Sequence, residues 1–153
     1  MSSVKALQTQ IQQSGLVDVP AASRDDALEA ARSGGLADFI VDCDRARSQS
    51  AVLRAIVKAV DFPDFFGNNL DALYDCLTDT VMEHADGVYL WFYRLHTGDP
   101  YLGQYTPAIL AVCDDAVEFA RNNDRVFSYT IEHAGKHPDP EEQNPDESTG
   151  DDA

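Results

Sequence analysis

The sequence has few basic residues: 11 Lys and Arg stand against 27 Asp and Glu, and the formal net charge is −16. Nucleic acids and anionic membrane surfaces are polyanions, so this charge argues against either of them as a direct ligand. The chain also lacks any apolar run near the ~20 residues that a membrane-spanning helix needs. A protein with a basic surface is therefore the class of partner that the composition favours.

Cysteine is scarce as well, and Cys43, Cys76 and Cys113 form an odd set without C-x-x-C spacing. This argues against a disulfide framework, and three reduced, buried thiols are the simplest interpretation. Reduced thiols fit a reducing compartment. The chain starts with MSSVKALQTQIQQSG, which lacks the apolar segment of a signal peptide. We therefore expect a cytoplasmic protein.

The sequence offers little for catalysis or for cofactor binding. His133 and His137 fall near the end of the chain, and it contains no Gly-rich phosphate loop. Asp71 and Asp75, one helical turn apart, could share a Mg²⁺ ion as in a metal-dependent hydrolase. Such a site would also need a base or an electrophile within reach. We expect no enzyme, no metal and no cofactor.

Strand and helix patterns alternate along the chain, which predicts the α/β class. Strand patterns occur at 37–44, 87–95 and 125–133, and helical spacing of apolar residues occurs at 48–60, 69–82 and 106–123. This order implies right-handed crossovers and a parallel sheet. We expect three core strands, and a fourth if segment 15–20 joins them. The segment 87–95 is apolar on both faces, which is typical of a strand buried on both sides.

Polar residues predict where several helices begin. Ser48 or Ser50 would cap the helix that follows them, and Asn69 would cap the next one. Thr106 is the predicted cap of the last helix, with Pro107 at its first position.

We expect one domain, because 153 residues fit an ordinary single domain. Residues 1–35 form an N-terminal extension, with a helix or loose leader, a possible short strand, and a helix that begins at a capping-box-like Ser23 and Asp26. Residues 36–136 form the main domain. Residues 137–153 are predicted to be a disordered acidic tail, because the last sixteen of them contain seven acids, three prolines and no base.

The stretch between Lys58 and Arg94 contains seven acids and neither Lys nor Arg. On a helix over 69–82, four residues form an apolar stripe that should face the core: Leu70, Leu73, Leu77 and Val81. Asp71, Asp75 and Thr78 lie about a quarter-turn away, with Asp79 at their flank and Tyr74 between the acids and the stripe. Like charges at this spacing cost an exposed helix roughly 0.2–0.5 kcal/mol per pair. The face is either merely solvated or a surface for a positive partner.

The segment 65–77, FFGNNLDALYDCL, resembles the signature of the barstar family, the cytoplasmic inhibitors of barnase-type ribonucleases. The resemblance extends over about 36–132, where the predicted order of strands and helices also agrees with the family. It implies the three-layer-like barstar fold, in which a parallel sheet of three, or here four, strands is packed with helices.

The resemblance also implies roles for individual residues. Asp75 matches the family's dominant carboxylate, which enters the nuclease active site in place of a substrate phosphate. Asp71 matches a second acid that pairs with active-site cations. Phe65 stands where barstar has Tyr, and Tyr74 stands where barstar has Trp. The further contact positions are Gly67, Asn69, Leu70, Thr78 and Asp79, of which Asp79 departs from barstar's own residue.

A late-helix acid contributes in barstar as well, and Glu118 is a candidate by a loose alignment. The implied function is inhibition of a basic extracellular or toxin ribonuclease, in a 1:1 complex formed by a monomer. The alternative is a barstar-fold interaction or immunity module that binds a different basic toxin or a partner that is not a nuclease.

Overall fold

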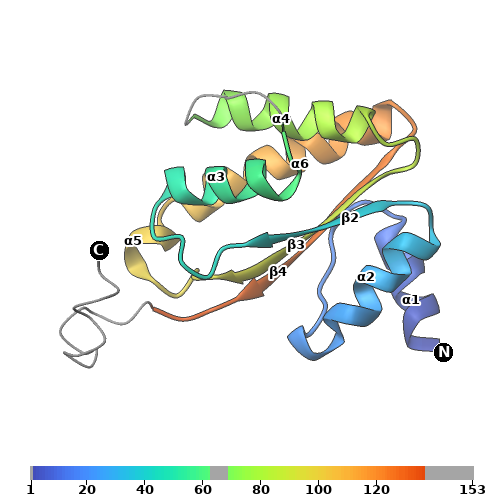
Figure 1. The fold of residues 1–153 in the computed structure, drawn as a ribbon, viewed down its shortest axis with the longest axis horizontal. Helices are drawn as coiled ribbons and strands as arrows, with labels where there is room; N and C mark the ends of the chain where they lie inside the picture. Colours follow the sequence, from blue (N-terminus) through green and yellow to red (C-terminus); the bar gives the residue numbers. More distant parts are fainter. Residues whose placement is uncertain (1, 63–68, 137–153) are drawn as a thin grey trace.

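The computed structural model describes residues 2–62 and 69–136 (Figure 1). The elements in chain order are α1 (Ser2–Ile11), β1 (Gly15–Leu16), the 3-10 turn η1 (Ala21–Ser23), α2 (Arg24–Ser33), β2 (Ala37–Asp42), α3 (Gln49–Ala59), α4 (Leu70–Met82), β3 (Gly87–Leu95), α5 (Pro100–Gly103), α6 (Thr106–Asn122) and β4 (Val126–His133). The predicted acidic tail 137–153 and the loop 63–68 lie outside the described residues. None of the described helices combines the length and the apolar character that crossing a membrane requires.

The sheet has four parallel strands in the order β1-β4-β3-β2. The predicted parallel sheet is confirmed, and the fourth strand comes from the segment 15–20 as the two-residue β1. β3 is the long inner strand, and its first six residues are buried, as the apolar run over 87–95 predicts. At Gly87, where φ is +124°, a Cβ atom would lie 2.0 Å from the Val126 carbonyl oxygen, so only glycine fits where β3 begins.

Helices cover both faces of the sheet (Figure 1). α3, α4 and α6 pack on one face, and α1 and α2 pack on the other. β3 contributes side chains to the cores on both faces of the sheet, because successive side chains of a strand point to opposite faces. Leu90 and Phe92 belong to the core under α3, α4 and α6, whereas Tyr89 and Trp91 belong to the core under α1 and α2. The N-terminal segment thus supplies the second helical layer.

Helix starts differ in part from the prediction. Ser48 caps α3, with its Oγ accepting from the Ala51 N–H at 3.1 Å. Thr106, predicted as a cap, is instead the first residue of α6, and its buried hydroxyl donates to the Leu102 carbonyl oxygen. The cause is the short helix α5, which runs almost directly into α6. Ser23 makes no side-chain capping bond, because η1 leads straight into α2.

Candidate protein-binding site

α4 begins and packs much as its sequence predicts. The Asn69 Oδ1 accepts from the Ala72 N–H at 2.8 Å, which is the predicted cap. Leu73, Leu77 and Val81 are buried, and Leu70 is half-buried at the edge of the core. The buried face is wider than the predicted stripe, since Cys76, Thr78 and Thr80 are buried as well.

The acids of α4 lie on its solvent side. Asp71, Asp75 and Asp79 are all exposed. Asp71 and Asp75 line a groove of about 630 Å³ between α4 and α6. We call it the acidic groove; it is lined by Leu70, Asp71, Tyr74, Asp75, Val112, Asp115, Glu118, Phe119 and Asn122. Asp79 is not among its lining residues.

α6 contributes two further carboxylates to this groove. Glu118, the loosely aligned candidate, lines it opposite Asp71 and Asp75, and so does Asp115. Sequence reasoning missed Asp115. Its spacing of three residues from Glu118 places both acids on one helical face, which was the available signal. Four carboxylates from two helices therefore converge on one opening.

Glu118 is held in place by a neighbouring base. Arg121 Nη1 lies 3.2 Å from the Glu118 carboxylate, and its Nη2 donates to the Gln13 carbonyl oxygen at 3.1 Å. The N-terminal extension thus contacts the arginine that pairs with Glu118 of the acidic groove. Asp114, next to Asp115 in sequence, is used elsewhere, since it accepts a hydrogen bond from the Tyr129 hydroxyl at 2.7 Å. Burial of Tyr129, with this carboxylate beside it, raises its pKa.

Tyr74 forms part of the groove wall. Its half-buried ring meets Phe119 of α6 edge to face, with centroids 6.5 Å apart and ring planes at 80°. This geometry is the favourable one for aromatic pairs. The contact fixes the ring between the two helices while leaving part of it open to a partner.

Thr78 departs from the predicted arrangement. Its side chain is buried, and its hydroxyl donates to the Tyr74 and Asp75 carbonyl oxygens at 2.9 and 3.2 Å. A threonine in a helix can bond back to the preceding turn in this way. The hydroxyl is therefore not part of the exposed acidic face. Phe65 and Gly67, the remaining predicted contacts, fall within 63–68, outside the described residues.

The part of the chain that the structure describes meets the requirements of neither a metal site nor a reactive thiol. Within 2–62 and 69–136, no three His, Cys, Asp or Glu side chains are arranged to hold a metal ion. All three cysteines are free and buried, as predicted. Burial raises the pKa of Cys43 and of Cys113 to about 12, and that of Cys76 to about 11. Thiols with such pKa values are poor nucleophiles, since the thiolate is the reactive form.

Comparison with known proteins assigns the part of the chain that contains the acidic groove to a family. The family model described as "Barstar (barnase inhibitor)" matches residues 36–132, which contain both helices of the acidic groove. The chain belongs to the barstar family. The family's description is that of an inhibitor, not of an enzyme.

Two individual proteins are also similar. A Bacillus subtilis (strain 168) protein named "Putative ribonuclease inhibitor YrdF" is 37% identical over 68 residues, which are 44% of this chain and 71% of that protein. The structure of the Aeropyrum pernix ORC2 protein, in ADPNP-ADP complexes, matches with a TM-score of 0.56 at 12% identity. That match covers 88% of this chain but only 41% of the ORC2 chain, and at this identity it concerns the fold alone.

Proposed function

We propose that this barstar-family chain inhibits a ribonuclease of the barnase type by covering its cationic active site with the acidic groove. The observation that carries the proposal is the convergence of Asp71 and Asp75 from α4 with Asp115 and Glu118 from α6 on one opening. Acids on one helix would be an ordinary solvated face. Acids from two helices around a shared hollow form a surface that complements a cluster of cations.

The chemistry of the partner follows from the charge. A ribonuclease holds RNA phosphates with Arg, Lys and His side chains. Carboxylates can satisfy the same cations through charge-assisted hydrogen bonds while offering no bond to cleave. Asp75 stands at the middle of the exposed side of α4 and is proposed as the central substitute for a phosphate. Opposite fields would also speed the encounter of the two proteins.

The proposed contact surface includes further residues of the acidic groove beside Asp75. Asp71 and Glu118 would pair with flanking cations, and Tyr74 would supply an aromatic contact at the groove wall. The partner would be a basic extracellular or toxin ribonuclease, bound 1:1 in the cytoplasm of the cell that makes both proteins. The buried free thiols suit that compartment.

The test is affinity capture with the full chain from the lysate and culture medium of the source organism. The wild type, Asp75→Ala and Glu29→Ala would be used side by side. Glu29 is a matched control, since it is an exposed acid on α2, in the layer on the other face of the sheet. We expect wild type and Glu29→Ala to capture a basic protein with ribonuclease activity and to inhibit it, and Asp75→Ala to fail at both.

Two outcomes would count against the proposal. If Asp75→Ala captures and inhibits the nuclease as well as the wild type does, phosphate substitution by this carboxylate is wrong. If the wild type captures a basic protein without nuclease activity, and Asp75→Ala does not, the acidic groove binds a different class of partner.

A further inference from the structure

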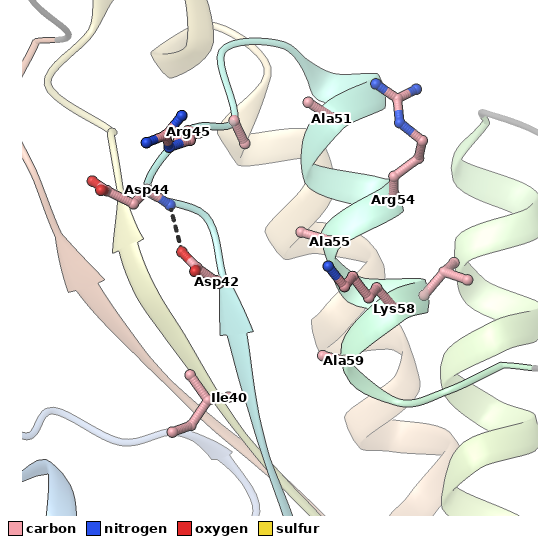
Figure 2. Close-up of a pocket in the computed structure, with 11 residues that line it drawn as sticks. Ile40, Asp42, Asp44, Arg45, Ala51, Arg54, Ala55, Lys58 and Ala59 are labelled. Carbon is pink, nitrogen blue, oxygen red and sulfur yellow. Dashed lines mark hydrogen bonds between the residues drawn. The ribbon is translucent and has the colours of Figure 1, made fainter. Parts of the chain in front are cut away.

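A second groove of opposite charge lies between α3 and β2 (Figure 2). It has a volume of about 1110 Å³. We call it the basic groove; it is lined by Ile40, Asp42, Asp44, Arg45, Ala46, Ala51, Arg54, Ala55, Val57, Lys58 and Ala59. Its three cations, Arg45, Arg54 and Lys58, are all exposed. The rest of the chain is strongly acidic, so a concentration of cations here is unexpected.

The cations of the basic groove make no ion pair among the described residues. Elsewhere in that part of the chain, four arginines do: Arg24, Arg32, Arg94 and Arg121. Among the described residues, the one side-chain hydrogen bond of these three cations runs from Arg54 Nη1 to the Ser50 hydroxyl oxygen, at 2.7 Å. The chain has more than twice as many acids as bases, and yet these three cations are not paired with any of the acids in its described part. They are therefore available to an acidic ligand.

The two acids of the groove are already engaged. Asp42 accepts a hydrogen bond from the Asp44 main-chain N–H at 3.1 Å (Figure 2). The Asp44 carboxylate lies 2.8 Å from Arg94 Nε and 3.1 Å from His96 Nε2. These contacts hold Asp44 toward β3 rather than toward the groove cations. The lining residues include three cations and two carboxylates, and one of these carboxylates is paired with Arg94 outside the groove, so the net charge that a ligand would meet is positive.

The shape of the groove suits an extended chain. Ala51, Ala55 and Ala59 point from α3 toward β2, and their small side chains leave the space between helix and strand open (Figure 2). β2 is an edge strand in the described sheet, because it pairs only with β3. Ile40 on this strand is 45% exposed. A slim, acidic segment without bulky apolar side chains would fit between the two elements.

The chain leaves the described fold beside this groove. The Gly135 carbonyl oxygen lies 2.6 Å from His96 Nδ1, and the other ring nitrogen of His96 contacts Asp44. Asp44 lines the groove and directly precedes Arg45. One imidazole ring therefore lies between Gly135, three residues before Pro138, and Asp44 at the rim of the basic groove.

We propose that the acidic tail 138–153 of the same chain occupies the basic groove. The tail carries seven acids and no base: Asp139, Glu141, Glu142, Asp146, Glu147, Asp151 and Asp152. An extended chain spans about 3.3 Å per residue, whereas the eleven residues of α3 rise about 1.5 Å each. The tail is therefore long enough to pass all three cations. A covalently linked ligand also acts at an effective concentration in the millimolar range.

The sequence of the tail decides the kind of contact. Pro138, Pro140 and Pro145 favour extended polyproline-type backbone and cannot donate to a strand ladder. The tail therefore binds through carboxylate–cation contacts over the alanine floor, not as a fifth strand. Such contacts between exposed charges are screened by salt.

Paramagnetic relaxation in the full chain tests this proposal. A spin label is attached at Ser148→Cys, and the native thiols do not compete because all three are buried. We expect the label to broaden the amide signals of residues 49–59 at ~10 mM salt, and the signals to recover at ~1 M, where the Debye length is only ~3 Å. Replacing the seven tail acids by their amides should remove the broadening without changing the folded part.

A charge-matched pair of variants locates the binding site. Arg54→Gln/Lys58→Gln removes two charges from the basic groove and should abolish the broadening. Lys5→Gln/Arg32→Gln removes the same charge from α1 and α2, in the opposite helical layer, and should preserve it. Equal effects of the two double variants would overturn the proposal. So would an absence of broadening in 49–59 at low salt. Broadening that appears only when spin-labelled chains are mixed with separate isotope-labelled chains would assign the tail to a second copy, which would also overturn it.

Discussion

The acidic groove and the basic groove are built in the same helical layer but carry opposite charge. The acidic groove lies between two helices, α4 and α6, and takes its carboxylates from both. The basic groove lies between a helix and an edge strand, α3 and β2, and takes its cations from α3 and from the loop after β2. The net charge of the chain, −16, does not predict the local charge of either groove. Local fields depend on which elements the fold brings together.

The comparison also separates two kinds of ligand. The acidic groove is walled by a tyrosine–phenylalanine pair, and aromatic anchors of this kind are common at protein interfaces. The basic groove has a floor of alanines and no aromatic side chain among its lining residues. The first suits a folded partner with a cationic site, and the second suits a narrow acidic segment.

The largest expected effect is that of Asp75→Ala on partner binding. Removing this carboxylate would leave the partner's cations buried without a counter-charge, so we expect a loss of about 2–5 kcal/mol, mostly in the dissociation rate. Arg54→Gln/Lys58→Gln should leave the affinity nearly unchanged. Surface plasmon resonance on the captured nuclease measures both. A stronger effect from the basic-groove variant would reverse the assignment of the two grooves.

Leu73→Ala tests whether binding losses reflect the acidic groove or the fold. Leu73 is fully buried in the core under α4, and truncation of such a leucine costs about 2–5 kcal/mol of unfolding free energy. Asp75→Ala should change that free energy by at most about 0.5 kcal/mol, because an exposed side chain leaves no cavity. Urea denaturation followed by circular dichroism gives both values. An Asp75→Ala protein as unstable as Leu73→Ala would invalidate its use as a binding probe.

Salt dependence distinguishes the acidic groove from an apolar docking surface. We expect the association rate constant to fall roughly ten- to a thousand-fold between ~10 mM and ~1 M salt, with a smaller change in dissociation. Stopped-flow mixing with the nuclease measures the rate. The dependence should persist in Arg54→Gln/Lys58→Gln. A rate indifferent to salt would show that the carboxylates do not guide the encounter.

The smallest expected effect concerns Asp44 at the rim of the basic groove. Hydrogen bonds from Arg94 and His96 hold the pKa of Asp44 below its ordinary value. A carboxyl group whose pKa is lowered on folding stabilises the fold above the unfolded pKa of about 3.9, and this contribution is lost as the pH falls through the folded value. Because the side chain is 43% exposed, we expect Asp44→Asn to cost only about 0.2–1 kcal/mol at pH 7.

Denaturation of wild type and Asp44→Asn across pH 2–7 checks this contribution, since the difference between them should shrink below about pH 4. A difference that stays constant with pH would mean that the substitution acts through packing and not through charge.

Much of the fold and part of the site could be predicted because their causes are local. Asn69 caps α4 through a bond to a residue three positions away, and Leu73 and Leu77 face the core because of helical periodicity. The double-sided apolar run of β3 identifies an inner strand in the same way. The prediction of Thr106 as a cap is wrong, because the short helix α5 ends just before it and has no clear signal in the sequence.

The sequence by itself determined the family signature, the alternation of strands and helices, and the acids on the outer side of α4. Only the tertiary structure decided that Asp115 and Glu118 join Asp71 and Asp75, and that Arg45 meets Arg54 and Lys58 across a groove. Periodicity tells which side of a helix faces solvent, but not which other helix or strand will flank that side. The acidic groove lies between two helices that are distant in sequence, and the basic groove lies between a strand and the helix that follows it. Both depend on how these elements pack when the whole core forms around the sheet.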